Sequence, residues 1–315
     1  MADLSNYLFW TGLVTSLIAS GLYIAYVASA SVSLRRMSAQ TSAGTVTISA
    51  ASGVPNPGIG RLATSFAAFT FLFMAGEVAS RWSAVGHAPV SNLYEFTSSL
   101  AFGISGAYLA FEVYTRNRRF GLLALPIVSA MLGVASTFPN DITPLIPALQ
   151  NGPLLTIHVS TMMISYAILT VAFCGAAIYL VQGGEGRRRF ASLPSAEAAG
   201  DLAHKAVMVG FPLLGLGIAL GAWWANSAWG RYWGWDPKET SALVTWLSMA
   251  AYFHARAGNG SVAGAPGIRK VVPEKVRRGW RPDPMWWLVV MWGLVMFTYF
   301  AVNLWVSGLH SYAGV

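Results

Sequence analysis

The chain has 315 residues, of which 55% are hydrophobic and only 10% are charged. The apolar residues form blocks long enough to cross about 30 Å of hydrocarbon, which takes about 20 helical residues. This excludes an ordinary soluble domain and predicts an all-α fold, a polytopic membrane helical bundle. The formal net charge of +8 does not indicate nucleic-acid binding, because basic residues in such chains report loop orientation.

Eight apolar segments follow one another along the chain. We predict transmembrane helices over residues 7–28, 62–79, 94–113, 120–137, 153–181, 204–224, 237–254 and 285–306. Residues 1–315 are therefore interpreted as a single integral membrane domain. Between the segments, residues 29–61 and 255–284 are rich in Gly, Ser, Pro or basic residues and are predicted to be cytoplasmic connectors.

The basic residues alternate between the predicted loops. All but three of the 20 Lys and Arg residues fall in one set of loops, and the other set holds only Arg81, Arg231 and Lys238. The positive-inside rule places the rich set in the cytoplasm, so both termini are expected on the extracytoplasmic side. The single cysteine, Cys174, cannot form an internal disulfide and is expected to be a small buried hydrophobic residue.

Residues 224–240 form a tryptophan-rich segment on the predicted extracytoplasmic side. Its indoles belong to Trp224, Trp229, Trp233 and Trp235. An aromatic belt is one interpretation, because Trp favours the membrane interface. Belts spread over many helix ends, however, whereas these indoles cluster in one loop. The clustering favours a site for a large flat ligand.

The same segment contains a helix start. Asp236, Pro237 and Glu239 fit the N-cap, N1 and N3 positions, so the seventh helix is predicted to begin at the outer surface. Asn226 and Gly230 argue against a continuation of the sixth helix. The four tryptophans are therefore expected on an irregular stretch of chain.

Two histidines share the predicted level of the tryptophan-rich segment. His158 lies five residues beyond a Gly-Pro helix start, and therefore about 8 Å below the outer end of the fifth helix, while His310 lies just beyond the eighth helix. Two imidazoles facing each other across an aromatic slot suit a six-coordinate haem iron. For either histidine alone, an interfacial side chain is an equally good interpretation.

The other three histidines give weaker signals. His254 is expected near the cytoplasmic face beside Arg256, about 27 Å along the seventh helix, where an interfacial side chain is the favoured interpretation for a lone residue. His204 opens the sixth segment and is assigned no role. His87 lies in a short outer loop, where a predicted N-cap and N3 pair at Asn92 and Glu95 indicates a structural role.

Together these residues resemble the CcsA family of System II cytochrome c biogenesis. The likeness rests on the segment 224–240 and on His158, His254 and His310 in their local sequences. It runs from about Arg81 to the last residue, and the segment matches the tryptophan-rich WWD signature of haem-handling membrane proteins.

The resemblance implies a cytochrome c synthase (haem lyase) component. It implies that the protein brings haem b to the extracytoplasmic face and, with a CcsB/ResB-like subunit, attaches it to the CxxCH motif of an apocytochrome c. His158 and His310 match the axial ligands of the outer haem. His254 matches a second, cytoplasm-side haem site, whose other ligand is thought to come from the partner; no second histidine at that depth is evident in this sequence. The resemblance also implies a thioredoxin-like reductant that acts indirectly. It implies a location in the plasma (inner) membrane, or in the thylakoid membrane for a plastid-encoded chain.

Within this resemblance we expect roles for the WWD segment. Trp229, Trp233, Trp235 and Asp236 are expected to hold the haem edge that is presented to CxxCH, and Trp224 to contact the haem. Arg231 is expected to pair with a propionate or, equally, to be a loop charge in water.

Two other functions fit the sequence. One is a haem exporter without ligase activity. The other is a quinone-linked or ion-translocating membrane subunit, for which Glu77 and Glu112 offer only a sparse path of intramembrane carboxylates.

Overall fold

The computed structural model describes residues 1–41, 54–141, 152–258, 283–306 and 308–310, and all regular elements within them are helical. The elements are α1 (Ala2–Thr41), α2 (Pro57–Val85), α3 (Leu93–Thr115), the 3-10 turn η1 (Arg118–Phe120), α4 (Gly121–Ala135), α5 (Gly152–Gln182), α6 (Ala196–Trp229), α7 (Pro237–Gly258), α9 (Met285–Met296), the π-helical turn η4 (Phe297–Ala301) and α10 (Val302–Leu304). Each of the eight predicted segments contains a helix, and α9, η4 and α10 together cover the last one. The predicted all-α class is confirmed.

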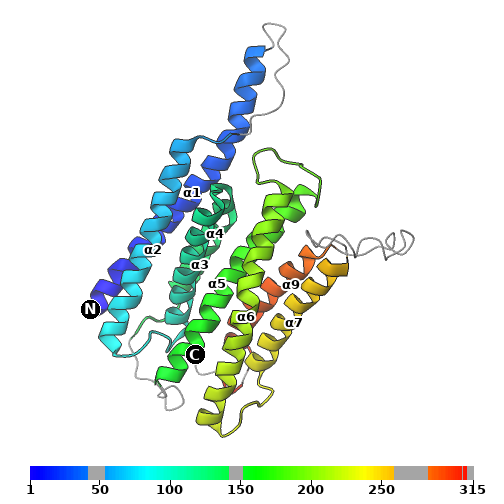
Figure 1. Ribbon diagram of the computed structural model, residues 1–315. Coiled ribbons are helices and arrows are strands. Elements are labelled where there is room, and N and C mark those ends of the chain that lie inside the picture. The colour runs from blue at the N-terminus through cyan, green and yellow to red at the C-terminus, as the bar shows by residue number, and fades with distance from the viewer. Residues whose placement is uncertain (42–53, 142–151, 259–282, 307, 311–315) are drawn as a thin grey trace.

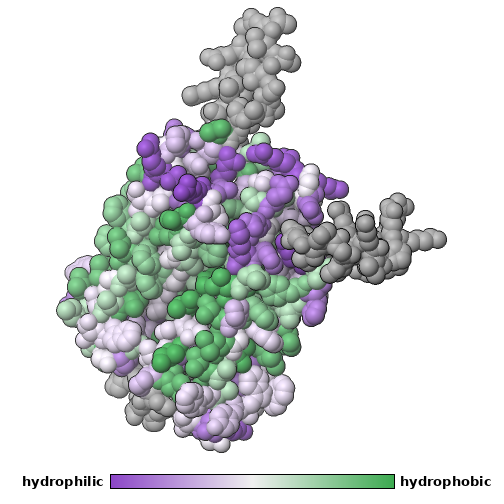
Figure 2. Space-filling model, viewed as in Figure 1, coloured by the Kyte–Doolittle hydropathy of each residue, from purple (hydrophilic) through white to green (hydrophobic). Residues whose placement is uncertain are grey.

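Six of these helical stretches are long and apolar enough to cross a membrane. They are α1 over residues 2–30, α2, residues 118–135, α5, α6 and residues 285–304. Figure 2 shows hydrophobic side chains over the middle of the molecule and hydrophilic ones gathered towards one end. The chain is therefore a multi-pass helical membrane protein. For α3 and α7, which carry charged residues, a membrane-spanning role stays a prediction.

The helices pack as an elongated bundle. Figure 1 shows α1 beside α2 on one flank, α3 and α4 in the middle, and α5, α6, α7 and α9 on the other flank. The most extensive contacts join α5 to α6 and α1 to α2. The main core includes Leu100, Leu132, Leu169 and Leu288, all fully buried, and Cys174 is buried as expected.

The first residues of α1 and the loop between α6 and α7 lie at the same end of the bundle, the lower end in Figure 1. The end of α7 and the turn between α5 and α6 lie at the opposite end. This arrangement matches the predicted pairing of loops. The side of the membrane that each end faces stays a prediction.

Three helices extend into predicted connectors, and one of them is α2, which begins at Pro57 inside the connector 29–61. α1 continues to Thr41, inside the predicted connector 29–61, and α7 continues to Gly258, inside the predicted connector 255–284. Residues 42–53 and 259–282 of these connectors lie outside the described residues.

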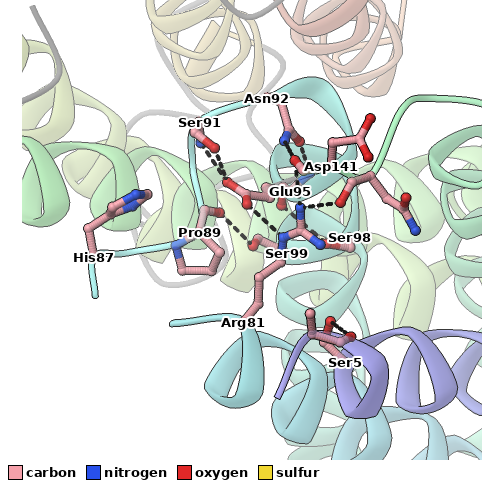
Figure 3. A network of polar contacts seen from close by, with 12 residues as sticks. Ser5, Arg81, His87, Pro89, Ser91, Asn92, Glu95, Ser98, Ser99 and Asp141 are labelled. Carbon is pink, nitrogen blue, oxygen red and sulfur yellow. Dashed lines mark hydrogen bonds and ion pairs between the residues drawn. The ribbon is translucent and has the colours of Figure 1, made fainter. Parts of the chain in front are cut away.

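Arg81 is not the loop charge that the sequence predicts. α2 extends to Val85 and ends at Gly86, whose φ of 76° is left-handed, so Arg81 lies within the helix. Its side chain is 3% exposed, and Nε donates to Glu95 Oε1 at 2.6 Å (Figure 3). A buried guanidinium needs a paired carboxylate, because desolvation without a partner is costly. The pair joins α2 to α3 beneath the loop that contains His87.

One of the two contacts of the predicted α3 cap is confirmed, the one made by the Asn92 side chain. Asn92 Oδ1 accepts from Glu95 N at 2.9 Å. The Glu95 carboxylate accepts from Ser91 N and Ser91 Oγ rather than from Asn92 N, because its other oxygen is taken by Arg81. His87 lies at the edge of this network, where Nδ1 is 2.9 Å from Ala88 O (Figure 3).

Candidate functional site

The start of α7 is capped by the side chains of Asp236 and Glu239. Asp236 Oδ1 accepts from Lys238 N at 2.9 Å, and Glu239 Oε2 accepts from Asp236 N at 3.0 Å and from Gly234 N at 2.9 Å. The predicted helix start at Pro237 is therefore confirmed. The cap fixes where the side chains of Asp236 and Lys238 leave the helix.

The expectation that the chain becomes irregular near Asn226 is wrong. α6 continues to Trp229, so Trp224 and Trp229 lie on its last turns. The carbonyl of Asn226 accepts from Gly230 N at 3.0 Å, and Gly230, with a φ of 71°, ends the helix. Glycine adopts this left-handed conformation without the steric cost that other residues meet. Only the stretch from residue 230 to 236 is irregular.

The Asp236 carboxylate also holds His310. Oδ1 is 2.8 Å from His310 Nδ1, and Oδ2 accepts from Leu309 N at 2.6 Å. A Cβ on Gly308 would lie 2.5 Å from Oδ2, so a glycine is needed for this close approach. Burial favours a raised pKa for Asp236, but the hydrogen bond and charge of His310 and the two backbone amides lower it to about 2. The carboxylate is therefore an ionised acceptor at neutral pH.

His158 is held in a similar way from the other side. It lies on α5, and Nδ1 is 2.9 Å from the carbonyl oxygen of Gly217 on α6. A Cβ on Gly221 would lie 2.6 Å from His158 Cε1. The imidazole therefore occupies the space that the missing side chain leaves on α6.

Trp224 lies close to both histidines. Its ring is nearly parallel to that of His158, at 8° with centroids 6.3 Å apart, and its centroid is 5.8 Å from that of His310. Trp229 meets both Trp224 and His310 edge to face, at centroid distances of 4.7 and 4.8 Å. These contacts group side chains from α5, α6 and the segment after α10 around one indole.

A cavity opens beside this group. It holds about 1050 Å³ of empty space, including some open solvent, and its walls come from α3, α5, α6, α7, η4 and α10. Leu155, Val159, Met162 and Ile218 contribute apolar surface. The polar or aromatic lining includes His158, His310, Trp224, Trp233, Lys238 and Asn303. Ligand sites in proteins are commonly such apolar cavities with a few placed polar groups.

Four of the residues predicted for the outer site do not line this cavity. Asp236 acts through its bond to His310, and Trp229 through its contacts with Trp224 and His310. Trp235 is 70% exposed and meets Trp233 edge to face at 5.8 Å. Arg231 is exposed on the loop.

His254 is far from the cavity and faces outward. It is exposed near the end of α7, whereas Tyr252, two residues earlier, is fully buried. Contrary to the expectation from the sequence, a second histidine lies at the same depth: His204 Nδ1 is 3.1 Å from Tyr252 Oη. Residues two apart on a helix point to different faces, so His204 packs on the Tyr252 side and not against His254.

The carboxylates Glu77 and Glu112 lie towards opposite ends of the bundle. Glu77 is one turn before Arg81, which pairs with Glu95 at the start of α3, whereas Glu112 lies near the end of α3 and accepts from Tyr23 and Thr64 at 2.5 Å each. The 17 residues from Glu95 to Glu112 span about 26 Å of helix. Glu77 and Glu112 are therefore not adjacent steps of one path of intramembrane carboxylates.

The cavity wall also contains buried polar atoms without partners among the described residues. Trp224 Nε1 and Asn303 Oδ1 are both buried and make no hydrogen bond. Buried polar groups are normally satisfied, so these two atoms suit a ligand with polar edges. No local sequence pattern indicates Asn303, Gly221 or Gly308, because their importance depends on contacts between distant segments.

The chain matches known proteins over most of its length. A family model described as cytochrome C assembly protein matches residues 90–310. Proteins named cytochrome c biogenesis protein CcsA are similar to it: that of Synechococcus elongatus is 34% identical, with 81% of this chain and 88% of the relative covered. Those of Porphyra purpurea and Microcystis aeruginosa are 33% and 32% identical, with the same coverage. The chain, a multi-pass membrane protein with paired histidines on one cavity, therefore belongs to the CcsA family of cytochrome c assembly proteins.

Proposed function

We propose that the cavity binds haem b through His158 and His310, and that the protein is the haem-presenting component of a cytochrome c synthase. The observation that carries this proposal is the convergence of these two histidines, distant in sequence, on one largely apolar cavity that Trp224 also lines. Axial ligation by two neutral imidazoles needs such a pair, and indole rings suit the porphyrin surface.

The hydrogen bonds support ligation by a defined nitrogen of each ring. Gly217 O and the ionised Asp236 carboxylate are acceptors only, so the Nδ1 atoms of His158 and His310 must donate. A neutral ring that donates through Nδ1 is the tautomer whose Nε2 lone pair can bind iron. Acceptors behind Nδ1 also orient a ligating imidazole and increase its basicity.

Thioether formation adds a thiol S–H across a haem vinyl C=C, so that one S–C and one C–H bond form with no net electron transfer. It needs ferrous haem, reduced thiols and a fixed haem orientation. The protein acts by positioning, which can lower a barrier by about 7–11 kcal/mol when reacting groups are well oriented. We assign Trp233 to the wall against the haem and exposed Trp235 to the CxxCH peptide, whose own histidine would displace one protein ligand.

The remaining assignments follow the family. We assign the CxxCH motif of an apocytochrome c as the acceptor, a CcsB/ResB-like subunit as the partner, and a thioredoxin-like reductant as the indirect source of reduced thiols. The exposed side chain of His254 suits a second haem ligand completed by that partner. The proposed topology has eight membrane-spanning helices with both termini extracytoplasmic, in the plasma (inner) membrane or in a thylakoid.

Absorption spectroscopy tests the proposal. The protein is purified with its CcsB-like partner, reduced with dithionite, and compared with His158→Ala and His310→Ala. We expect a low-spin bis-histidine spectrum in the unaltered protein that is lost in either variant and restored by added imidazole. Unchanged haem spectra and unchanged cytochrome maturation in a variant with both substitutions would show that these residues are not the ligands.

A further inference from the structure

A porphyrin in this cavity brings charge with it. Haem carries two carboxylates, and burying a carboxylate without a partner is costly. Most of the lining is apolar, and one lysine, Lys238, is the cationic side chain of the Lys or Arg type among the lining residues that the structure describes. The ammonium of this lysine is therefore the group to examine.

Lys238 is largely unsatisfied by protein groups. It is the second residue of α7, and its Nζ donates to the carbonyl oxygen of His310 at 3.3 Å and lies 5.9 Å from the ring centroid of Phe96. Among the described residues it has no ion pair within 4.0 Å. An ammonium has three donors, and only one is used here.

The neighbouring carboxylates are directed elsewhere. Glu239, which also lines the cavity, accepts from two backbone amides through Oε2. Asp236 accepts from His310, Leu309 and the backbone amide of Lys238. Because the cap and the His310 contact engage both acids, Lys238 is available to an anion inside the cavity.

Arg231, for which a propionate partner and a loop charge in water are equal expectations from the sequence, is a poorer candidate. It is exposed on the loop and does not line the cavity. A charge in water gains little from an ion pair, because solvent screens it. Lys238, partly buried and beside His310, meets a carboxylate in a less polar environment.

We propose that Lys238 binds a carboxylate of the cargo porphyrin and thereby fixes the rotation of the ring about the line through its two histidine ligands. This rests on the proposed function, since it concerns the same cavity. A ring held by iron alone can rotate about the line through its two ligands, and a second, off-axis contact removes that freedom. Lys238 is thus a positioning residue: it determines which edge, carboxylate or vinyl, faces the loop between α6 and α7.

The test compares haem with its dimethyl ester, in which both carboxylates are blocked and the iron and ring are unchanged. Each is titrated into the full chain in detergent, and affinity and absorption spectrum are recorded for the unaltered protein, Lys238→Met, Lys238→Arg and Arg231→Met. We expect the unaltered protein to prefer haem over the ester by about tenfold or more, the order expected for a hydrogen bond to a charged group. Lys238→Met should lose this preference while binding the ester as before. Lys238→Arg and Arg231→Met should keep it.

The spectrum of the ester complex separates this role from a structural one. A bis-histidine spectrum in Lys238→Met shows that His310 is still in place. If that spectrum were lost with the ester as well, Lys238 would act by holding His310, and the proposal would be wrong. An unaltered protein with no preference for haem would also overturn it, while a bis-histidine spectrum would leave the proposed function standing. If neither compound bound, the proposed function itself would fail.

Discussion

The carboxylate of Asp236 connects three parts of the site. It receives hydrogen bonds from Lys238 N in the cap, from Leu309 N and from His310 Nδ1. Only the cap bond involves neighbours in sequence, and that bond is the one that the sequence predicts. The bond to His310 joins positions 74 residues apart, and no spacing rule indicates such a pair.

Replacing Asp236 with Asn should weaken the outer site. The amide can keep the cap through its oxygen, but its NH₂ group would face Leu309 N–H, and a buried donor left without an acceptor costs about 1–3 kcal/mol. We therefore expect haem affinity to fall about tenfold in a titration followed by absorption. Asp201→Asn, which changes an exposed carboxylate on α6, is the control and should bind normally. Normal binding by Asp236→Asn would mean that the Leu309 N–H contact does not position His310.

The same variant has a pH signature. The pKa of Asp236 is lowered from 3.8 to about 2, so its ionised form stabilises the fold above about pH 4, and this contribution is lost as the pH falls towards 2. The difference in melting temperature between the unaltered protein and Asp236→Asn should shrink as the pH falls below about 4. A difference that grew on acidification would contradict this sign.

At the scale of elements, α6 carries much of the site. Its Gly217 carbonyl accepts from His158, its Gly221 makes room for the same ring, and its last turns place Trp224 and Trp229. These features share one rigid helix, so their relative positions are fixed by the 3.6-residue period. The position of the His158 ring therefore depends on α6, although His158 itself belongs to α5.

Replacing Gly221 with Ala should displace His158. The added Cβ would lie 2.6 Å from Cε1, a distance that forces the ring to move. We expect the reduced spectrum to lose its bis-histidine character, with recovery on addition of imidazole. Gly133→Ala in α4 is a matched control, since no heavy atom lies within 4 Å of its added Cβ. Retention of the bis-histidine spectrum in Gly221→Ala would show that the ring has another place to go.

The elements themselves follow largely from the sequence. Apolar segments and caps such as Asp236 with Glu239 are local signals, and the helices appear where those signals predict them. Errors arose where a local signal was ambiguous: Asn226 disfavours a helix only weakly, and the left-handed glycine at 230 decides where α6 ends. The role of Lys238 was missed because nothing local distinguishes a charge that faces a cavity from one that faces water.

At the scale of the whole molecule, the two ends of the bundle differ. One end holds the start of α1, the loop between α6 and α7, and the cavity, and the other holds His204, His254 and the turn between α5 and α6. The buried Arg81–Glu95 pair joins the last turns of α2 to the first turn of α3. Arg81, which the sequence alone assigns to a loop, is therefore buried inside the bundle.

Cysteine accessibility tests the predicted sides. The native Cys174 is buried and should give little background labelling. Tyr232→Cys, exposed on the loop between α6 and α7, should react with a membrane-impermeant maleimide in intact cells. Glu185→Cys, exposed in the turn between α5 and α6, should react only after permeabilisation. The reverse pattern would place the cavity on the cytoplasmic side.

The dependence of His310 on Asp236 also sets an order of assembly. His310 follows the last described helix, and its imidazole is held by the residue that starts α7. During synthesis, a chain with α5, α6 and α7 already inserted would present His158 and Trp224 but only one axial imidazole. Under the proposed function, completion of the histidine pair waits for the segment after α10, and chains that stop before it are poor traps for a reactive porphyrin.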